Sequence, residues 1–121
     1  MTALQDRVNG LIEYIQTGKI LEAMDEFYAD DVKMQENAKD PCVGLAANIE
    51  REKEFLANVK DFHAFDVLAV GIDEAKQAVL IESQMRFTSV GGDEVVLEQV
   101  SATRWKDGKI THERFYYDSA G

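Results

Sequence analysis

The N-terminal part of the chain alternates apolar and polar positions with the period of an α-helix. Val8, Leu11 and Ile15 recur every three to four residues, which predicts a helix with one buried stripe. Gly18 marks the end of this helix, since glycine favours the position that follows a helical C-terminus. Residues 20–27 repeat the apolar spacing, so a second, shorter helix follows at once and the two form a tight pair.

A short alternating segment separates this pair from a third predicted helix. Val32, Met34 and Glu36 share one face of the expected strand, and a polar loop at residues 37–44 follows it. Apolar residues then return to helical spacing at about residues 45–59. The first half of the sequence is therefore predicted to be mainly helical.

From residue 62 onward the character of the chain changes to that of β-strands. Three long runs, at residues 62–72, 77–89 and 94–106, are rich in β-branched or aromatic residues. The Asp-Gly turn after the third run supplies the positive φ angles of a tight hairpin, so residues 109–118 are expected to pair with the preceding strand. Strands joined by short turns, with no helix between them, predict a meandering antiparallel sheet and the α+β class.

Composition narrows the class of protein further. A chain of 121 residues is in the usual size range of one domain, so residues 1–121 are expected to form a single domain. The net charge of −10 would repel phosphate backbones and anionic lipids, so neither a nucleic-acid nor a membrane partner is expected. No apolar run resembles a signal peptide, and the lone Cys42 cannot form an intramolecular disulfide. A cytoplasmic location follows as the expectation.

Two short motifs and the order of elements resemble a known superfamily. The segment Phe-Tyr-Ala-Asp-Asp-Val occupies residues 27–32, and Arg-Trp-Lys-Asp-Gly-Lys-Ile occupies residues 104–110. Together they resemble the nuclear transport factor 2-like superfamily, and within it the SnoaL-like proteins. The resemblance implies a cone-shaped α+β barrel, in which three N-terminal helices lie against a curved, mainly antiparallel sheet around an apolar cavity. Because this superfamily includes isomerases, cyclases, dehydratases, epoxide hydrolases and non-enzymatic binding modules, the fold leaves the function open.

Glu36 is the first candidate for chemistry. It follows Met34 on one strand face, and a carboxyl group at the apolar end of a strand can have a raised pKa and act as a general base. The resemblance puts Glu36 where ketosteroid isomerases and several cyclases keep the acid that moves a proton beside a carbonyl. The alternative is that the strand ends at Asn37 and that Glu36 reaches solvent.

Glu113 is the second candidate. It shares one face of the last strand with Phe115 and would be a second carboxyl group in the cavity if that face points inward. Two acids in different surroundings can divide the acid and base roles of a reaction. A salt bridge from Glu113 to Arg86 or Arg114 is the alternative interpretation.

Further candidates would line the cavity. The resemblance favours the Trp105 face of the strand at residues 94–106, which would expose Gln99 and Ser101 to the cavity as neutral hydrogen-bonding groups. These two side chains can instead fill space or bind a buried water. Tyr14 lies one helical turn from Leu11 and either contacts the ligand or belongs to the core. The full set of expected ligand contacts is Tyr14, Met34, Phe55, Gln99, Ser101, Phe115 and Tyr117.

At several positions the sequence differs from the catalytic residues of the family, and these differences limit which reactions the resemblance implies for this chain. Isomerases stabilise an enolate with a helix-one tyrosine and a protonated strand acid, where this chain has Leu11 and Ser101. Epoxide hydrolases hold water with an Arg-x-Asp pair, where this chain has Gln99, Val100 and Ser101. The two histidines are 49 positions apart with no second ligand at a recognisable spacing, so no metal and no cofactor is expected.

The leading hypothesis is a SnoaL-like domain that binds a small hydrophobic molecule. If the domain is an enzyme, the expected reaction is a cofactor-independent isomerisation, cyclisation or dehydration with Glu36 as general base. The alternative is a non-catalytic module of the same fold that binds a ligand or dimerises. Residues Leu80, Glu82, Gln84 and Arg86 lie along one strand face and would suit a homodimer contact through the sheet.

Overall fold

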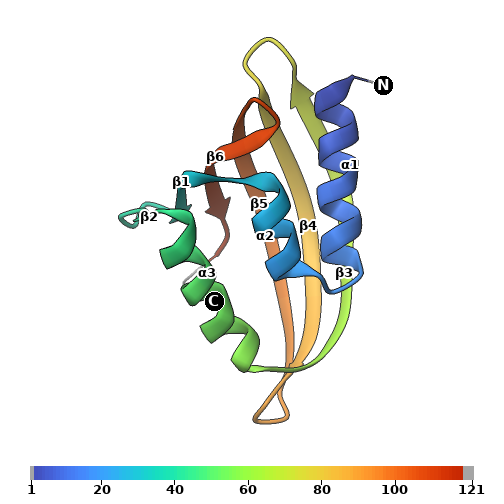
Figure 1. Cartoon of the computed structure of the whole chain (residues 1–121). Helices are drawn as coiled ribbons and strands as arrows, with labels where there is room; N and C mark the ends of the chain where they lie inside the picture. Colours follow the sequence, from blue (N-terminus) through green and yellow to red (C-terminus); the bar gives the residue numbers. More distant parts are fainter. Residues whose placement is uncertain (1, 119–121) are drawn as a thin grey trace.

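The computed structural model describes residues 2–118, which form three helices and one six-stranded sheet (Figure 1). The helices are α1 (Ala3–Gln16), α2 (Ile20–Phe27) and α3 (Leu45–Ala57). The strands are β1 (Tyr28–Glu36), β2 (Cys42–Val43), β3 (Val59–Asp73), β4 (Ala78–Ser89), β5 (Glu94–Lys106) and β6 (Lys109–Tyr116). Within residues 2–118, no helix is long and apolar enough to cross a membrane.

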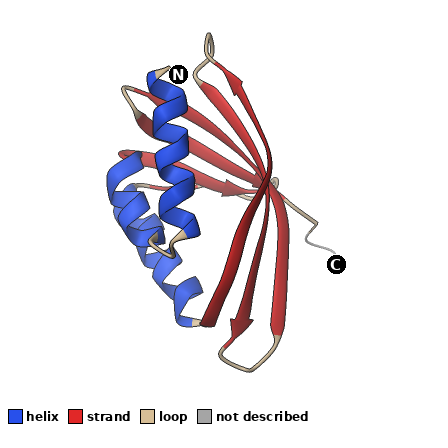
Figure 2. Cartoon of the chain, turned by 90° about the vertical axis from the view of Figure 1, so that its right-hand side faces the viewer, coloured by secondary structure: helices blue, strands red, loops and turns tan. Residues whose placement is uncertain are grey.

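The sheet is curved and carries all three helices on one face. Its strand order is β2-β1-β6-β5-β4-β3, and every neighbouring pair is antiparallel except β1 and β6, which run parallel. Figure 2 shows the helices on the concave side of the bent sheet, while the convex side stays uncovered. β2 and β3 are the two edges, so the sheet does not close on itself. The predicted α+β fold is therefore confirmed, as an open cone.

The helical pair forms as its apolar spacing predicts. Thr2 caps the first helix: its hydroxyl oxygen accepts a hydrogen bond from the backbone N–H of Gln5, and the Gln5 side chain accepts one from the backbone N–H of Thr2. Gly18 adopts a φ of 78°, which lets the chain turn into α2. Val8 and Leu11 are buried against the sheet.

The core between the first two helices and the sheet contains polar side chains that are linked by hydrogen bonds. Trp105 Nε1 donates a hydrogen bond to Thr103 Oγ1 at 2.8 Å, and that hydroxyl donates to the carbonyl oxygen of Val79 at 3.2 Å. Val32 and Ile110 are completely buried beside this chain of hydrogen bonds. Polar side chains are rarely buried in a protein core unless they form hydrogen bonds of this kind.

The last strand contains an irregularity that simple alternation misses. Counting alternate residues puts Ile110 on the face opposite to Glu113, but both side chains are buried. The register between β5 and β6 shifts where Arg104 pairs with His112 and Trp105 pairs with Ile110, so one extra residue lies in β6. A β-bulge of this kind changes which side chains of a strand point inward. Alternation counted back from Glu113 therefore assigns Ile110 to the wrong face.

Candidate functional site

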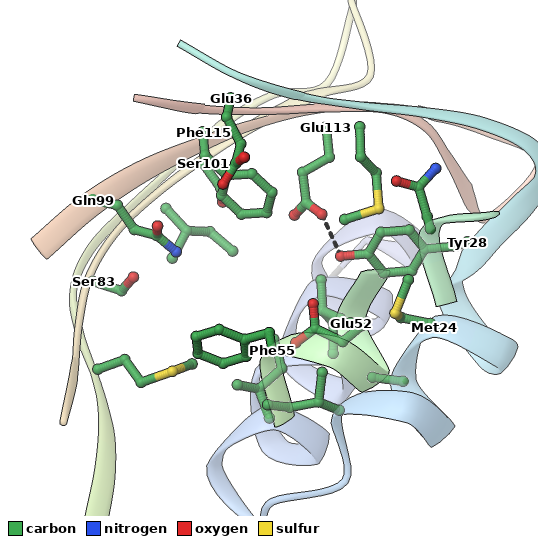
Figure 3. A pocket seen from close by; sticks show the side chains of 18 of the residues that line it. Met24, Tyr28, Glu36, Glu52, Phe55, Ser83, Gln99, Ser101, Glu113 and Phe115 are labelled. Carbon is green, nitrogen blue, oxygen red and sulfur yellow. Dashed lines mark hydrogen bonds between the residues drawn. The ribbon is translucent and has the colours of Figure 1, made fainter. Parts of the chain in front are cut away.

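A cavity of about 250 Å³ lies between the helices and the concave face of the sheet (Figure 3). Its apolar lining includes Leu11, Met24, Phe55, Met85, Leu97 and Phe115. Its polar lining includes Glu36, Glu52, Ser83, Gln99, Ser101 and Glu113. An apolar pocket with a few polar groups is the usual form of a small-molecule site.

Glu113 is the most deeply buried acid of this cavity, with only 4% of its surface exposed. Its side chain lines the cavity, and the hydroxyl of Tyr28 donates a hydrogen bond to its Oε1 atom at 2.5 Å. Burial raises the pKa of Glu113 to about 7; the bond from Tyr28 lowers it, and the nearby Glu52 adds to the increase. In Figure 3 the second oxygen of Glu113 points away from Tyr28.

Tyr28 stands where α2 ends and β1 begins, and it is 7% exposed. Desolvation and the neighbouring Glu113 raise the pKa of this phenol well above its ordinary value, so Tyr28 remains a hydrogen-bond donor. The salt bridges considered for Glu113 are not formed: Arg86 pairs with Asp66, and Arg114 donates to the carbonyl oxygen of Asn37. The partner of the buried acid is thus a neutral hydroxyl group.

Glu52 is a cavity residue that the sequence reasoning missed. Desolvation raises its pKa, the adjacent Arg51 lowers it, and Glu36 raises it. Glu52 was hidden in a run of charged residues that looked like a solvated helix face. The helical spacing indicates that Glu52 points into the cavity, because Asn48 and Phe55 lie one helical turn before and after it and both line the cavity.

Glu36 lies at the rim of the cavity, and its side chain is 39% exposed. Arg51 Nη2 donates to its Oε2 atom at 3.1 Å, and the Tyr117 hydroxyl donates to its Oε1 atom at 3.2 Å. Glu36 therefore shares the cavity with Glu113 but has a wet, ion-paired environment. Tyr117 contacts Glu36 and is not itself part of the cavity lining.

The other predicted contacts divide into two groups. Met34, Phe55, Gln99, Ser101 and Phe115 all line the cavity, as expected. Tyr14 does not: its ring packs edge-to-face against Phe27, with the ring centres 5.3 Å apart. Of the two alternatives for Tyr14, the structure shows the core one, because the helical turn directs Leu11 to the cavity and Tyr14 to the interface with α2.

The histidines lie outside this site. His63 Nε2 is 2.6 Å from Thr88 Oγ1 and 3.3 Å from a carboxylate oxygen of Glu94. His112 faces Lys33 and Arg104 across the neighbouring strands, and its pKa is lowered by desolvation and then by nearby cations. Across residues 2–118, His, Cys, Asp and Glu side chains form no group of three or more that could hold a metal ion.

Solved structures of the same fold resemble this chain closely in shape. A protein from Mesorhizobium loti described as a SnoaL-like polyketide cyclase has a TM-score of 0.81 at 23% identity, with 97% of this chain and 100% of that chain covered. An epoxide hydrolase of the LEH-like type from M. tuberculosis has a TM-score of 0.76 at 19% identity, with 96% and 83% covered. TerC, crystallised with polyporic acid, has a TM-score of 0.79 at 14% identity, with 98% and 93% covered. At these identities the likeness establishes the fold.

The family of this chain is identified by comparison of its sequence. No protein with a curated description matches the chain in sequence. The family model of the SnoaL-like domain, however, matches residues 8–113, which span the elements from α1 to Glu113 in β6. With the fold, this match confirms the SnoaL-like resemblance seen in the sequence: the chain belongs to the SnoaL-like domain family.

Proposed function

We propose that the cavity binds a small, largely apolar organic molecule and that Glu113 exchanges a proton with it. The observation that carries this proposal is a carboxyl group, 4% exposed in the cavity wall, with a pKa of about 7. A group with such a pKa can both give and accept a proton near neutral pH, which is the requirement for general acid–base catalysis. The reaction class that fits is a cofactor-independent isomerisation, cyclisation or dehydration.

The two predicted acids would take different roles. Glu36 is ion-paired with Arg51 at the rim and is the candidate base, as the sequence suggests. Glu113 is buried beside Tyr28 and is the candidate acid. Two carboxyl groups in such different surroundings, one ion-paired at the rim and one buried beside a phenol, can divide the base and acid roles of a reaction. Tyr28 would act as a positioning residue, since its hydroxyl fixes one oxygen of Glu113.

Family membership supports ligand binding in this cavity. TerC, a protein of the same fold, was crystallised with polyporic acid, and the protein from Mesorhizobium loti is described as a polyketide cyclase. This chain has Gln99 and Ser101 where epoxide hydrolases have an Arg-x-Asp pair, so epoxide hydrolysis by that pair is not proposed.

A thermal-shift screen of ketones and lactones, followed by turnover assays on the compounds that bind, tests the proposal. Glu113→Gln keeps the shape of the side chain and its acceptor for Tyr28 but removes the proton, so kcat should fall about 10²-fold or more. Glu98→Gln on the exposed face of β5 is the matched control and should keep full activity. Unchanged turnover by Glu113→Gln would exclude Glu113 as the proton donor.

A second proposed function is self-association through the convex face of the sheet. Large apolar side chains are exposed on its long strands: Leu68, Leu80 and Val96 are 63%, 52% and 54% exposed, and Tyr116 is 45% exposed. The face expected to dimerise, along Leu80 to Arg86, points outward on β4. Exposed apolar groups mixed with charged ones suit a contact between two copies of the chain.

A further inference from the structure

The sheet side of the cavity carries three polar side chains that have no partner in the protein. They are Ser83 on β4 and Gln99 and Ser101 on β5. Ser83 and Ser101 are only 4% and 8% exposed, yet none of the three side chains forms a hydrogen bond with any residue from 2 to 118. Figure 3 shows Ser83 and Gln99 across the cavity from Tyr28 and Glu52.

These three groups form one patch, which we call the polar row. Ser83 pairs directly with Gln99 in the register of β4 and β5, and Ser101 is the next inward residue along β5. Glu113 pairs with Thr103, one inward position further on. At the rise of a β-strand, Ser101 lies about 7 Å and Gln99 about 13 Å along the sheet from the level of Glu113. The far end of the polar row, at Gln99 and Ser83, is thus well separated from Glu113.

The polar atoms of these side chains face the cavity rather than the packed core. Because no described residue occupies them, they are available to bind a molecule in the cavity. Hydroxyl and amide groups each can donate and accept, so the polar row suits a hydroxyl or a carbonyl oxygen equally well. A bound molecule can supply the missing partner.

The charges of the cavity restrict this molecule further. Glu36, Glu52 and Glu113 line it, with Arg51 as the basic side chain in the same lining, and Arg51 already pairs with Glu36. A ligand carboxylate would lie near Glu52 without a free cation in the cavity lining, and desolvating it there would be costly. At about 250 Å³ the cavity is larger than a 150 Å³ cavity that holds benzene, so a two-ring body fits.

We infer that the ligand carries two separate oxygen groups, hydroxyl or carbonyl, at opposite ends of an apolar body, and has no negative charge. One oxygen group is held by Glu113 and the other by the polar row. This inference rests on the proposed function, because it assumes that the cavity is the ligand site. It adds the chemical class of the ligand and the residues that select it, Ser83, Gln99 and Ser101.

Calorimetric titration with three rigid probes at pH 6 tests the inference. The probes are 4-hydroxybiphenyl, 4,4′-dihydroxybiphenyl and 4′-hydroxybiphenyl-4-carboxylate, which share one body and differ at one end. The dihydroxy probe should bind the protein about tenfold more tightly than the monohydroxy probe, as expected for one added hydrogen bond. The carboxylate probe should bind more weakly than the dihydroxy probe.

A variant of the polar row separates its effect from general binding. Ser83→Ala, Gln99→Met and Ser101→Ala together should remove the preference for the dihydroxy probe and leave the affinity for the monohydroxy probe within about twofold. Because none of the three side chains makes a hydrogen bond within residues 2–118, this variant should fold about as stably as the parent. Gln84→Met, on the outer face of β4, is the matched control and should keep the preference.

Three results would overturn the inference. The first is equal affinity of the parent protein for the two hydroxy probes, and the second is an equal loss of affinity for both probes in the triple variant. The third is no binding of any probe up to millimolar concentration. Failure of the proposed function has a different signature. In that case Glu113→Gln retains turnover, whether or not the polar row discriminates between the probes.

Discussion

At the scale of single residues, Glu113 has a property that the other acids of the site lack. It is buried in the cavity wall with the neutral phenol of Tyr28 as its partner, whereas Glu36 is half-exposed and is ion-paired with Arg51 as well as bonded to a phenol. Burial penalises the charged form, so the proton stays on Glu113 up to about neutral pH. The same penalty links the protonation of this group to the stability of the fold.

Glu113→Gln should therefore change how stability depends on pH. The folded-state pKa of about 7 lies above the ordinary value of 4.5, so the folded state binds more protons between these values and the free energy of unfolding falls as pH rises through them. The full difference corresponds to about 3 kcal/mol. Urea unfolding should show the variant more stable than the parent at pH 8 by up to this amount, and the advantage should vanish near pH 4.

Glu98→Gln is the control for that measurement, because Glu98 is exposed on the outer face of β5. Its effect on the free energy of unfolding should be small at both pH values. A Glu113→Gln advantage that stays constant from pH 4 to pH 8 would mean that the carboxyl group does not titrate in this range.

Tyr28→Phe tests the hydrogen bond to Glu113 directly. The bond from Tyr28 favours the charged carboxylate and lowers its pKa, so removing the hydroxyl should move the pKa of Glu113 above about 7. NMR titration of the glutamate side-chain carbons checks this shift. A pKa that moves toward 4.5 would show that Tyr28 does not donate to the carboxylate.

Sequence reasoning at this scale found the acids that follow strand alternation and missed the one on a helix. Glu36 and Glu113 were found because each interrupts an apolar strand face. Glu52 was missed because its charged neighbours hid its helical spacing to Asn48 and Phe55. The two alternatives for Tyr14 could not be separated, since an amphipathic helix offers several inward positions and only tertiary packing decides which of them meets the cavity.

At the scale of elements, α3 influences two acids of the sheet, Glu36 and Glu113. Arg51 pairs with Glu36, while the next residue, Glu52, acts on Glu113 through its charge. One helix thus carries a cation for the exposed acid and an anion for the buried acid. The contrast between the two carboxyl groups depends on how α3 seats against the sheet.

Glu52→Gln should lower the pKa of Glu113. The negative charge of Glu52 raises that pKa, so its removal eases ionisation of Glu113. Glu54→Gln, on the exposed face of the same helix, is the matched control and should leave the pKa of Glu113 unchanged. Equal effects of the two variants in an NMR titration would show that the influence of Glu52 is not local.

Most elements could be predicted from periodicity, while their pairing and exact phase could not. The helices and long strands follow local spacing of apolar residues, which needs no tertiary information. The parallel pairing of β1 with β6 joins segments far apart in the chain and leaves no local signal. The bulge near Thr111 is likewise fixed by the pairing of β6 with β5.

At the scale of the whole molecule, the two faces of the sheet serve different proposed purposes. The cavity lies between the concave face and the helices. The convex face is not covered by helices (Figure 2), and large apolar side chains are exposed on its strands. The cone could be predicted from the family resemblance, whose motifs mark the fold better than the chemistry. The ligand of the cavity could not be predicted, because proteins that share one fold can catalyse different reactions.

Self-association through the convex face gives a prediction of its own. Sedimentation velocity should show a dimer at micromolar concentration, and Leu80→Glu should dissociate it by burying an unpaired charge in the contact. Glu54→Gln, far from this face on α3, should leave the sedimentation coefficient unchanged. A parent protein that sediments as a monomer throughout this range would rule out the contact.

The measurement that tests the central claim most directly is the NMR titration of Glu113 in the unmodified protein. With carbon-labelled glutamate, and Glu113→Gln to identify the signal, the carboxyl carbon should titrate with a midpoint at about 7. That result would give the cavity an acid able to exchange protons near neutral pH. A midpoint near the ordinary value of 4.5 would contradict the account, because Glu113 would then be a carboxylate at neutral pH with no proton to give.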